Sequence, residues 1–320
     1  MTEPDLRMWE TNGIKLRVAE AGTGPPVVLL HGWPESGYSW RHQIPALADA
    51  GYRVIAPDQR GYGRSDAPDA VEDYDIHHLC DDVVGLLDQI DAEDAVIVGH
   101  DWGAIIAWQF ALLHPDRTRA VCGMSVPFAG RMPVAPTQAF KAMRGEDFFY
   151  ILYFQELGVA EAEFDADPRG FLSRVYGRLP ASEVGLLWGG PQREPGWLQD
   201  FVPAEPLPDW LSQEELDYYV GEFERAGFRG GINYYRNFDR NWETTPELAE
   251  AKVTQPALFV AGEKDPVIAG FDAQAQARMH EVVPSLSELV LIPGAAHWVQ
   301  QEKAAEVNAA LLNWLGRLDA

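Results

Sequence analysis

The sequence predicts an α/β protein with a mostly parallel central sheet flanked by helices and with a long helical insertion. Short apolar runs alternate with helical stretches in the first part of the chain. This alternation stops after Pro127 and resumes at Ala257. Strands and helices that alternate in this way are typical of a parallel sheet covered by helices on both faces.

The first part of the chain is predicted to contain a hairpin followed by strand–helix units. Thr11, Asn12 and Gly13 form a turn signal between two alternating segments, so residues 8–20 are expected to be a β-hairpin. Apolar runs of strand length and intervening amphipathic stretches then predict strands at 27–30, 52–56, 95–98 and 120–124 and helices near 38–49, 75–90 and 103–114.

The segment after Pro127 is rich in aromatic, proline and acidic residues and is predicted to be an insertion. Helices are expected in it around 138–156 and 213–227. We therefore assign residues 1–128 and 250–320 to the core and residues 129–249 to a helical lid. Because open α/β sheets bind ligands beyond the carboxyl ends of their strands, an insertion at that edge would cover the site. The resumed pattern predicts strands at 257–260 and 289–292 and helices at 271–281 and 303–317.

The composition excludes several classes of partner. A formal net charge of -24 argues against nucleic acid or an anionic membrane, since both repel such a surface. No apolar run approaches the roughly 20 residues of a membrane-spanning helix, and the first residues lack the features of a secretory signal, so a cytoplasmic location is expected. Cys80 and Cys122 lie in apolar segments, as expected of reduced, buried thiols.

Neither a metal ion nor another cofactor is expected. His77 and His78 are neighbours and would point about 100° apart on a helix, and no His-Glu-x-x-His pattern occurs. A monomer and a homodimer are both compatible with this composition.

The candidate nucleophile is Asp101, which lies in the motif Gly-His-Asp-Trp-Gly at 99–103. This motif fits a tight, strained turn between a buried strand and a helix, where Gly99 and Gly103 keep the turn free of side chains. A carboxylate nucleophile is best suited to attack on saturated carbon, which makes the enzyme the acyl half of an ester. The alternative is that Asp101 only caps the helix. In either case, the helix N-terminus is expected to lower the pKa of its carboxyl group.

Two further candidates follow later strands. Asp265 comes after the strand at 257–260, and His297 comes after the strand at 289–292. Nucleophile, acid and histidine then occur in the chain order of the α/β-hydrolases. Glu263 is the alternative to Asp265 as the acid. Taken singly, Asp265 could be only a turn former and His297 an ordinary loop histidine, but three coincidences of type, place and order favour a catalytic triad.

A candidate oxyanion hole is formed by two backbone N–H groups. The loop 31–35 has the sequence His-Gly-Trp-Pro-Glu and directly follows the strand at 27–30. It can direct the N–H of Trp33 at the nucleophile, beside the N–H of Trp102. The alternative is that this loop is a simple turn between a strand and a helix.

With these motifs in place, the chain resembles the soluble-type epoxide hydrolases of the α/β-hydrolase superfamily over essentially its whole length. The resemblance rests on the loops that carry Asp265 and His297 and on motifs at 31–35, 61–65, 99–103, 150–155 and 233–237. It implies an α/β-hydrolase fold with an inserted helical lid, a cis peptide bond before Pro34, and two lid tyrosines that correspond to Tyr150 and Tyr235.

The tyrosines separate two reactions that share the triad. An epoxide oxygen leaves as an alkoxide and needs a proton donor such as a phenol, whereas a halide is a weak base and needs none. Spacing alone does not choose between Tyr150 and Tyr153, or between Tyr234 and Tyr235, and the resemblance selects Tyr150 and Tyr235. The alternative is that these tyrosines only pack the core of the lid.

These observations predict hydrolysis of a small apolar epoxide by water to a vicinal diol, through an ester on Asp101. The alternatives are a haloalkane dehalogenase with the same triad and a catalytically silent binding module of the same fold. Aromatic residues suggest an apolar pocket, and Phe128 and Trp188, with Trp197 and Trp210 as further candidates, are expected to contact the substrate.

Overall fold

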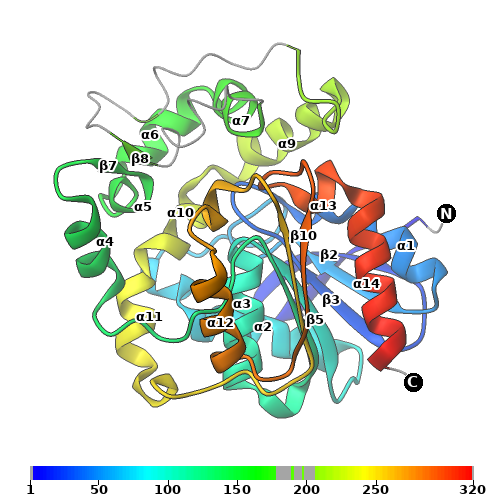
Figure 1. Cartoon of the computed structure of the whole chain (residues 1–320). Coiled ribbons are helices and arrows are strands. Elements are labelled where there is room, and N and C mark those ends of the chain that lie inside the picture. The colour runs from blue at the N-terminus through cyan, green and yellow to red at the C-terminus, as the bar shows by residue number, and fades with distance from the viewer. Residues whose placement is uncertain (1–2, 178–188, 191–196, 198–205, 319–320) are drawn as a thin grey trace. The chain divides into compact units, whose positions relative to one another are not determined.

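The computed structural model describes residues 3–177, 189–190, 197 and 206–318 (Figure 1). The chain forms two compact units. The first contains residues 1–60, 76–131 and 247–320, and the second contains residues 61–75 and 132–246. Within the described ranges, no helix is long and apolar enough to cross a bilayer.

The first unit is built on one sheet, to which the described residues contribute eight strands in the order β1-β2-β4-β3-β5-β6-β9-β10. The pairs β1–β2 and β2–β4 are antiparallel, and all other pairs are parallel. This is the mostly parallel sheet that the sequence predicts. The strands are β1 Asp5–Thr11, β2 Ile14–Ala21, β3 Pro26–Leu30, β4 Arg53–Pro57, β5 Ala95–His100, β6 Thr118–Met124, β9 Ala257–Gly262 and β10 Leu286–Ile292.

The predicted hairpin is formed by β1 and β2. Asn12 and Gly13 occupy its turn with φ angles of 48° and 77°. Both central residues of a two-residue hairpin turn of this kind have positive φ, and Asn-Gly is the sequence that adopts it most readily.

Helices cover both faces of the sheet. Figure 1 shows α1 and α14 on one side and α2, α3 and α12 on the other. Two strands with neighbours on both sides, β5 and β9, are buried along their whole length, as expected of strands covered on both faces. The helical segments of this unit are η1 Gly37–Trp40, α1 Gln43–Asp49, α2 Ile76–Gln89, α3 Trp102–Leu113, η3 Pro115–Arg117, η5 Pro266–Ile268, α12 Ala273–Val282, α13 Val299–Glu302 and α14 Ala304–Leu318.

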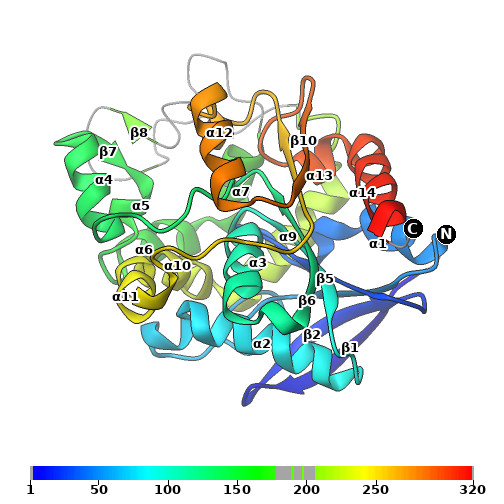
Figure 2. The same cartoon turned by 60° about the horizontal axis from the view of Figure 1, so that its bottom comes forward.

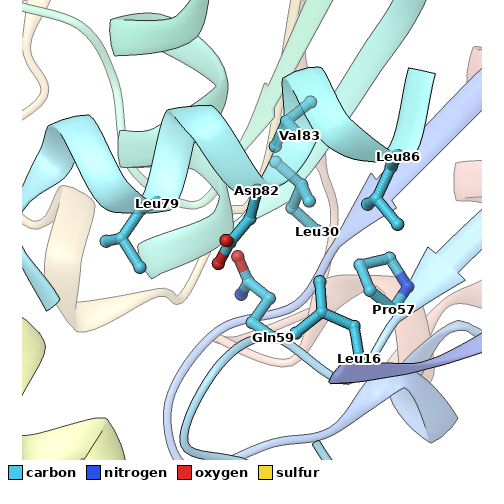
Figure 3. A pocket seen from close by; sticks show the side chains of 8 residues that line it. All are labelled: Leu16, Leu30, Pro57, Gln59, Leu79, Asp82, Val83 and Leu86. Carbon is cyan, nitrogen blue, oxygen red and sulfur yellow. The ribbon is translucent and has the colours of Figure 1, made fainter. Parts of the chain in front are cut away.

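One core cluster lies between the sheet and the helices α1 and α14. Trp40 and Trp314 are its largest side chains, and strand residues such as Val27, Val98 and Val260 pack with them. On the other side of the sheet, a small hollow lies between α2 and the strands (Figure 3). Its lining is mostly apolar, and its one carboxylate, Asp82, is held by Arg60, so we interpret the hollow as a packing gap.

The second unit is mainly helical, as predicted. Helix α9 begins with a capping box formed by Ser212 and Glu215, and α7 begins with Asp167 as N-cap before Pro168. The described elements are η2 Val71–Tyr74, α4 Pro136–Arg144, β7 Phe148–Phe149, α5 Tyr150–Tyr153, α6 Val159–Ala166, α7 Pro168–Tyr176, β8 Gly189–Gly190, α9 Gln213–Ala226, α10 Arg229–Arg236 and α11 Phe238–Thr244, and η4 Pro246–Leu248 spans the boundary between the units. Figure 2 shows α4, α5, α10 and α11 of this unit from a second direction.

Two expectations for the insertion differ from the structure. The single helix expected at 138–156 is wrong: α4 ends at Gly145, which has a φ of 58°, and Phe148 and Phe149 pair with β8 before α5 begins. Residues 61–75, which we assigned to the core, belong to the second unit. There, Tyr62 and Tyr74 pack against Tyr234. The other unit boundaries lie within a few residues of the expected ones.

Candidate active site

The candidate nucleophile lies where the order of the strands reverses. Strand β3 pairs with β4 on one side and with β5 on the other, although the chain passes from β3 to β4 before it reaches β5. The loops that leave β3 and β5 diverge at such a point, which is where open α/β sheets bind ligands. The loop 31–35 follows β3, and Asp101 directly follows β5.

Asp101 has the strained backbone of a tight turn. Its φ of 52° and ψ of -115° are unfavourable for a residue with a side chain. The flanking glycines make this turn possible, because a Cβ atom on Gly99 would overlap the carbonyl group of Gly103, and one on Gly103 would overlap the carbonyl group of Leu30. The prediction that both positions must be small is confirmed.

The side chain of Asp101 does not cap the helix that follows it. The residue occupies the N-cap position of α3, but its carboxylate makes no capping hydrogen bond. Its Oδ1 instead accepts a hydrogen bond from the backbone N–H of Trp33 at 2.9 Å, and the N–H of Trp102 also stabilises the carboxylate. The other oxygen, Oδ2, lies 3.7 Å from Nε2 of His297. The two oxygens therefore have different surroundings.

His297 is held by Asp265 on the opposite side of its ring. Nδ1 of His297 lies 3.2 Å and 3.1 Å from the two carboxylate oxygens of Asp265, which is 2% exposed. Asp265 Oδ1 also accepts the N–H of Val267 at 2.9 Å. Glu263, the alternative acid, is exposed, and its carboxylate lies near the N–H of Gly294. The geometry therefore favours Asp265.

Burial and charge set the protonation of these groups. Burial raises the pKa of Asp101, and the charge of His297 opposes this increase. The N–H of Trp102 at the helix N-terminus does lower this pKa, as predicted, but the net shift is upward because loss of water outweighs the N–H donors. Burial alone would lower the pKa of His297, but the charge and hydrogen bond of Asp265, and then the charge of Asp101, raise it to about 9.

Glu35 connects the three loops that carry these groups. Its Oε2 accepts the N–H of Gly32 at 2.8 Å and lies 2.8 Å from Nδ1 of His100. Its Oε1 accepts the side-chain amides of Gln300 and Gln301, both at 2.9 Å. The carboxylate is fully buried. Although burial would raise the pKa of Glu35, the charge and hydrogen bond of His100 lower it.

The predicted tyrosines lie together in the second unit. The rings of Tyr150 and Tyr235 are 5.7 Å apart and nearly perpendicular. Tyr153, the other candidate on α5, donates its hydroxyl group to Glu163 at 2.7 Å, and burial followed by this hydrogen bond raises its pKa. Tyr234 is fully buried and packs edge-on against Tyr62. Tyr150 and Tyr235 thus contact each other, whereas the hydroxyl of Tyr153 binds Glu163 and the ring of Tyr234 packs against Tyr62.

Comparison with known proteins identifies the family. The alpha/beta hydrolase fold family matches residues 25–304. Epoxide hydrolase A of Mycobacterium tuberculosis is 53% identical, over 100% of this chain and 99% of its own length. The chain belongs to the epoxide hydrolase family of the α/β-hydrolase fold. Epoxide hydrolase 1 of Siraitia grosvenorii is a further relative, with 40% identity over 95% of this chain and 96% of its own.

Solved epoxide hydrolase structures have the same fold. Epoxide hydrolase A from Mycobacterium thermoresistibile superposes with a TM-score of 0.93, at 53% identity over 98% of both chains. An epoxide hydrolase from an endophytic Streptomyces superposes with a TM-score of 0.95, at 43% identity over 99% of this chain and 96% of the other. The predicted α/β-hydrolase fold is confirmed.

Four aromatic residues of this epoxide hydrolase are expected to contact the substrate, and three of them lie among the described residues. Phe128 follows β6, is 7% exposed and packs against Trp108 at 6.2 Å between ring centroids. Trp188 lies outside the described residues. Trp197 stacks on Tyr150 at 5.7 Å, whereas Trp210 packs against Tyr176. Trp197 is therefore a neighbour of the tyrosine pair.

Sequence reasoning missed the residues that connect the loops of this epoxide hydrolase. The backbone carbonyl oxygen of His297 accepts hydrogen bonds from Nε2 of His100 at 2.8 Å and from the hydroxyl of Ser125 at 3.0 Å. Glu35 and His100 lie within the motifs at 31–35 and 99–103, but their partners lie far away in the sequence. The one sequence feature that could have indicated this network is the acidic residue Glu35, which lies in a loop between two buried segments. Among the described residues, no group of three His, Cys, Asp or Glu side chains could hold a metal ion.

Proposed function

We propose that this protein hydrolyses epoxides to vicinal diols through a covalent ester on Asp101. The observation that carries the proposal is the asymmetric environment of the Asp101 carboxylate. Oδ1 is held by the backbone N–H of Trp33, whereas Oδ2 lies near His297. A carboxylate fixed in this way can attack through one oxygen and keep the other in an oxyanion hole.

In the first step, Oδ2 of Asp101 attacks an epoxide carbon. The new carbon–oxygen bond forms as the epoxide carbon–oxygen bond breaks, and the released oxygen takes a proton from Tyr150 or Tyr235. The product is an ester between Asp101 and the alkyl chain, which carries a hydroxyl group on the adjacent carbon. Tyrosine is suited to this role because its phenol carries a proton at neutral pH and donates it to a developing alkoxide.

In the second step, water hydrolyses the ester. His297 takes a proton from a water molecule, whose oxygen attacks the carboxyl carbon of Asp101. Negative charge then develops on Oδ1, where the N–H groups of Trp33 and Trp102 stabilise it. The bond between Oδ2 and the alkyl carbon is retained in the product, so the bond from Oδ2 to the carboxyl carbon breaks. The departing oxygen takes the proton from His297 and leaves as the second hydroxyl group of the diol. The second proton of the water remains on the carboxyl group of Asp101, and its return by way of solvent to the tyrosine that donated in the first step restores the resting enzyme.

The state of His297 changes between the two steps. In the resting enzyme its pKa of about 9 leaves it protonated at neutral pH, beside the ionised Asp101. Ester formation removes the negative charge of Asp101, which contributes to that raised pKa. Loss of this charge lowers the pKa of His297 and makes it available as a base when the ester is present.

The tyrosine pair favours an epoxide over a haloalkane as the substrate. A departing halide is a weak base and needs no proton, so a pair of phenols serves no purpose in dehalogenation. The named relatives described above are epoxide hydrolases. These relatives and the intact triad also argue against a silent binding module.

A single turnover in heavy-oxygen water tests the proposal. Enzyme in excess over an aryl oxirane is mixed in labelled water, and the protein is digested and analysed by mass spectrometry. We expect the label in the peptide that contains Asp101 and unlabelled oxygen in the diol. Label in the diol and none in the peptide would indicate direct attack by water and would exclude the ester. An Asp101→Asn variant, checked by mass for deamidation, is the control for unspecific labelling.

A further inference from the structure

The two proposed proton donors stand on helices that cannot fix their mutual position by themselves. Tyr150 begins α5, which is a single turn of four residues, and Tyr235 lies near the end of α10. A helix of one turn is unstable in isolation, because nucleation costs more than a single hydrogen bond returns. The placement of Tyr150 therefore depends on contacts from outside α5.

Gln155 makes one of these contacts. Its side-chain amide donates to the backbone carbonyl oxygen of Ile151 at 2.9 Å and to that of Tyr235 at 3.1 Å. The first acceptor is the residue next to Tyr150, and the second is the other tyrosine itself. A single amide group thus ties the backbone of α5 to the backbone of α10.

Arg236, the residue after Tyr235, makes a second set of contacts. Its guanidinium donates to five acceptors, which equals its number of N–H groups, and its side chain is 4% exposed. Two acceptors belong to the turn that follows α5: the carbonyl oxygens of Phe154 and Glu156, at 2.9 Å and 2.8 Å. The other three are the side-chain oxygen of Asn233 on α10, at 2.9 Å, and both carboxylate oxygens of Glu161 on α6, at 2.5 Å and 3.0 Å. The turn between α5 and α6 is therefore folded around Arg236.

The aromatic rings follow this backbone arrangement. The ring of Phe154 contacts both tyrosines, with its centroid 5.5 Å from Tyr150 and 5.0 Å from Tyr235. Both contacts are edge-to-face, the geometry that aromatic pairs prefer. Because Arg236 holds the carbonyl group of Phe154, the side chain of the residue after Tyr235 also helps to fix the ring that packs against both tyrosines.

We propose that Gln155 and Arg236 are positioning residues for the Tyr150–Tyr235 pair, and that they set the rate of epoxide ring opening. This inference rests on the proposed function, in which the two phenols serve ring opening alone. Proton transfer needs heavy atoms within hydrogen-bond distance, and a displacement of about 1 Å can cost roughly 100-fold in rate. Ester hydrolysis uses His297 and the oxyanion hole of the first unit and does not need this alignment.

The test measures the two half-reactions separately in Arg236→Lys and Gln155→Met. Lysine keeps the positive charge but has three donors on one atom and cannot match five acceptors in a plane. Methionine keeps the length of glutamine and removes its amide. Rapid quenching and intact-mass analysis with an aryl oxirane give the rate of ester formation, its final amplitude and the rate of ester decay.

We expect ester formation to slow by about 10- to 100-fold in each variant, with ester decay and the fraction of active protein unchanged. A structural defect would instead reduce the amplitude, or slow both steps together. Two matched substitutions at exposed positions of the same unit, Arg169→Lys and Gln213→Met, should leave both rates unchanged, because these side chains pair with Asp217 at the surface.

Several outcomes would overturn the inference. Unchanged ester formation in both variants, or an equal loss in both half-reactions, would do so. If Arg236→Lys fails to fold, as judged by circular dichroism, Gln155→Met alone decides. The rate of ester formation in Tyr150→Phe/Tyr235→Phe shows which of the two proposals fails. If ring opening is undiminished in this double variant, the phenols do not have the proposed role. If ring opening is lost in the double variant but normal in Arg236→Lys and Gln155→Met, only the positioning role of Gln155 and Arg236 is removed.

Discussion

The imidazole of His100 donates a hydrogen bond from Nε2 to the backbone carbonyl oxygen of His297 over 2.8 Å. The residue before the proposed nucleophile is thereby joined to the proposed base, although 197 positions separate them in the sequence. The other ring nitrogen of His100 lies 2.8 Å from Glu35, which is fully buried. Asp101, His297 and the loop of Trp33 are thus supported by one buried polar network.

The first prediction concerns this network. Glu35→Gln keeps the shape of the side chain but removes the charge that faces His100, and it places an amide donor among groups that already donate. We expect the free energy of unfolding to fall by about 3 kcal/mol, because breaking a buried ion pair leaves its partner uncompensated. Urea denaturation measures the change.

The control for this prediction is Glu288→Gln, which removes a surface ion pair. Arg317 and Glu288 lie 2.9 Å apart and are 52% and 39% exposed. Exposed pairs of this kind contribute at most about 1 kcal/mol. Equal losses in the two variants would mean that the buried network gives no special support.

The second prediction concerns the base. In His297→Gln the ester should form but not decay, since histidine is needed only for hydrolysis of the ester. Intact mass should then show close to one alkyl adduct per protein after mixing with an aryl oxirane, and peptide mapping should locate it on Asp101. The wild type under the same conditions is the control. A variant that accumulates no adduct, from an epoxide that the wild type hydrolyses, would contradict the mechanism.

The third prediction concerns the tyrosines. Each single change, Tyr150→Phe or Tyr235→Phe, should slow ring opening, and the double change should slow it by at least about 100-fold, the usual contribution of a general acid. Single-turnover kinetics measure the effect. Tyr153→Phe is the matched control, because this hydroxyl is engaged by Glu163. A greater loss of ring opening in Tyr153→Phe than in the double variant would reverse the assignment.

The fourth prediction concerns the pKa of His297. Asp265 and Asp101 both raise it, and it reaches about 9 in the resting protein. Asp101→Asn removes one negative charge, as ester formation does, so the pKa of His297 should fall in this variant. It should fall further in Asp265→Asn, because Asp265 makes the larger contribution. Titration of the histidine side chains by nuclear magnetic resonance measures these shifts.

The shifted pKa values of Asp101 and His297 give the two half-reactions different pH dependences. Ring opening needs the ionised form of Asp101, whose pKa is raised, so its rate should fall on acidification at a pH above that of an ordinary aspartate. Ester decay needs neutral His297 and should rise with pH, with a midpoint below 9. A histidine pKa that is the same in Asp101→Asn and in the wild type would contradict this coupling.

Much of the fold follows from local pattern. The hairpin turn at Asn12 and Gly13, the strand–helix alternation and the glycines around Asp101 are features of adjacent residues, and each has a direct physical meaning. The break after α4 was harder to predict. Gly145 ends that helix with a positive φ, and the apolar spacing continues past it. Periodicity alone does not register such a break.

The candidate site also combines features that the sequence predicts with features that depend on the tertiary structure. By itself the sequence determined the identity and chain order of Asp101, Asp265 and His297, because each stands directly after a strand and the ends of parallel strands meet at one edge of a sheet. Only the tertiary structure decided the partners of Glu35, the sign of the pKa shift of Asp101, and which side chains surround each candidate tyrosine. These depend on burial and on partners such as Gln300, which is 265 positions from Glu35. Contacts at such separations arise from packing of the whole chain, and no local pattern encodes them.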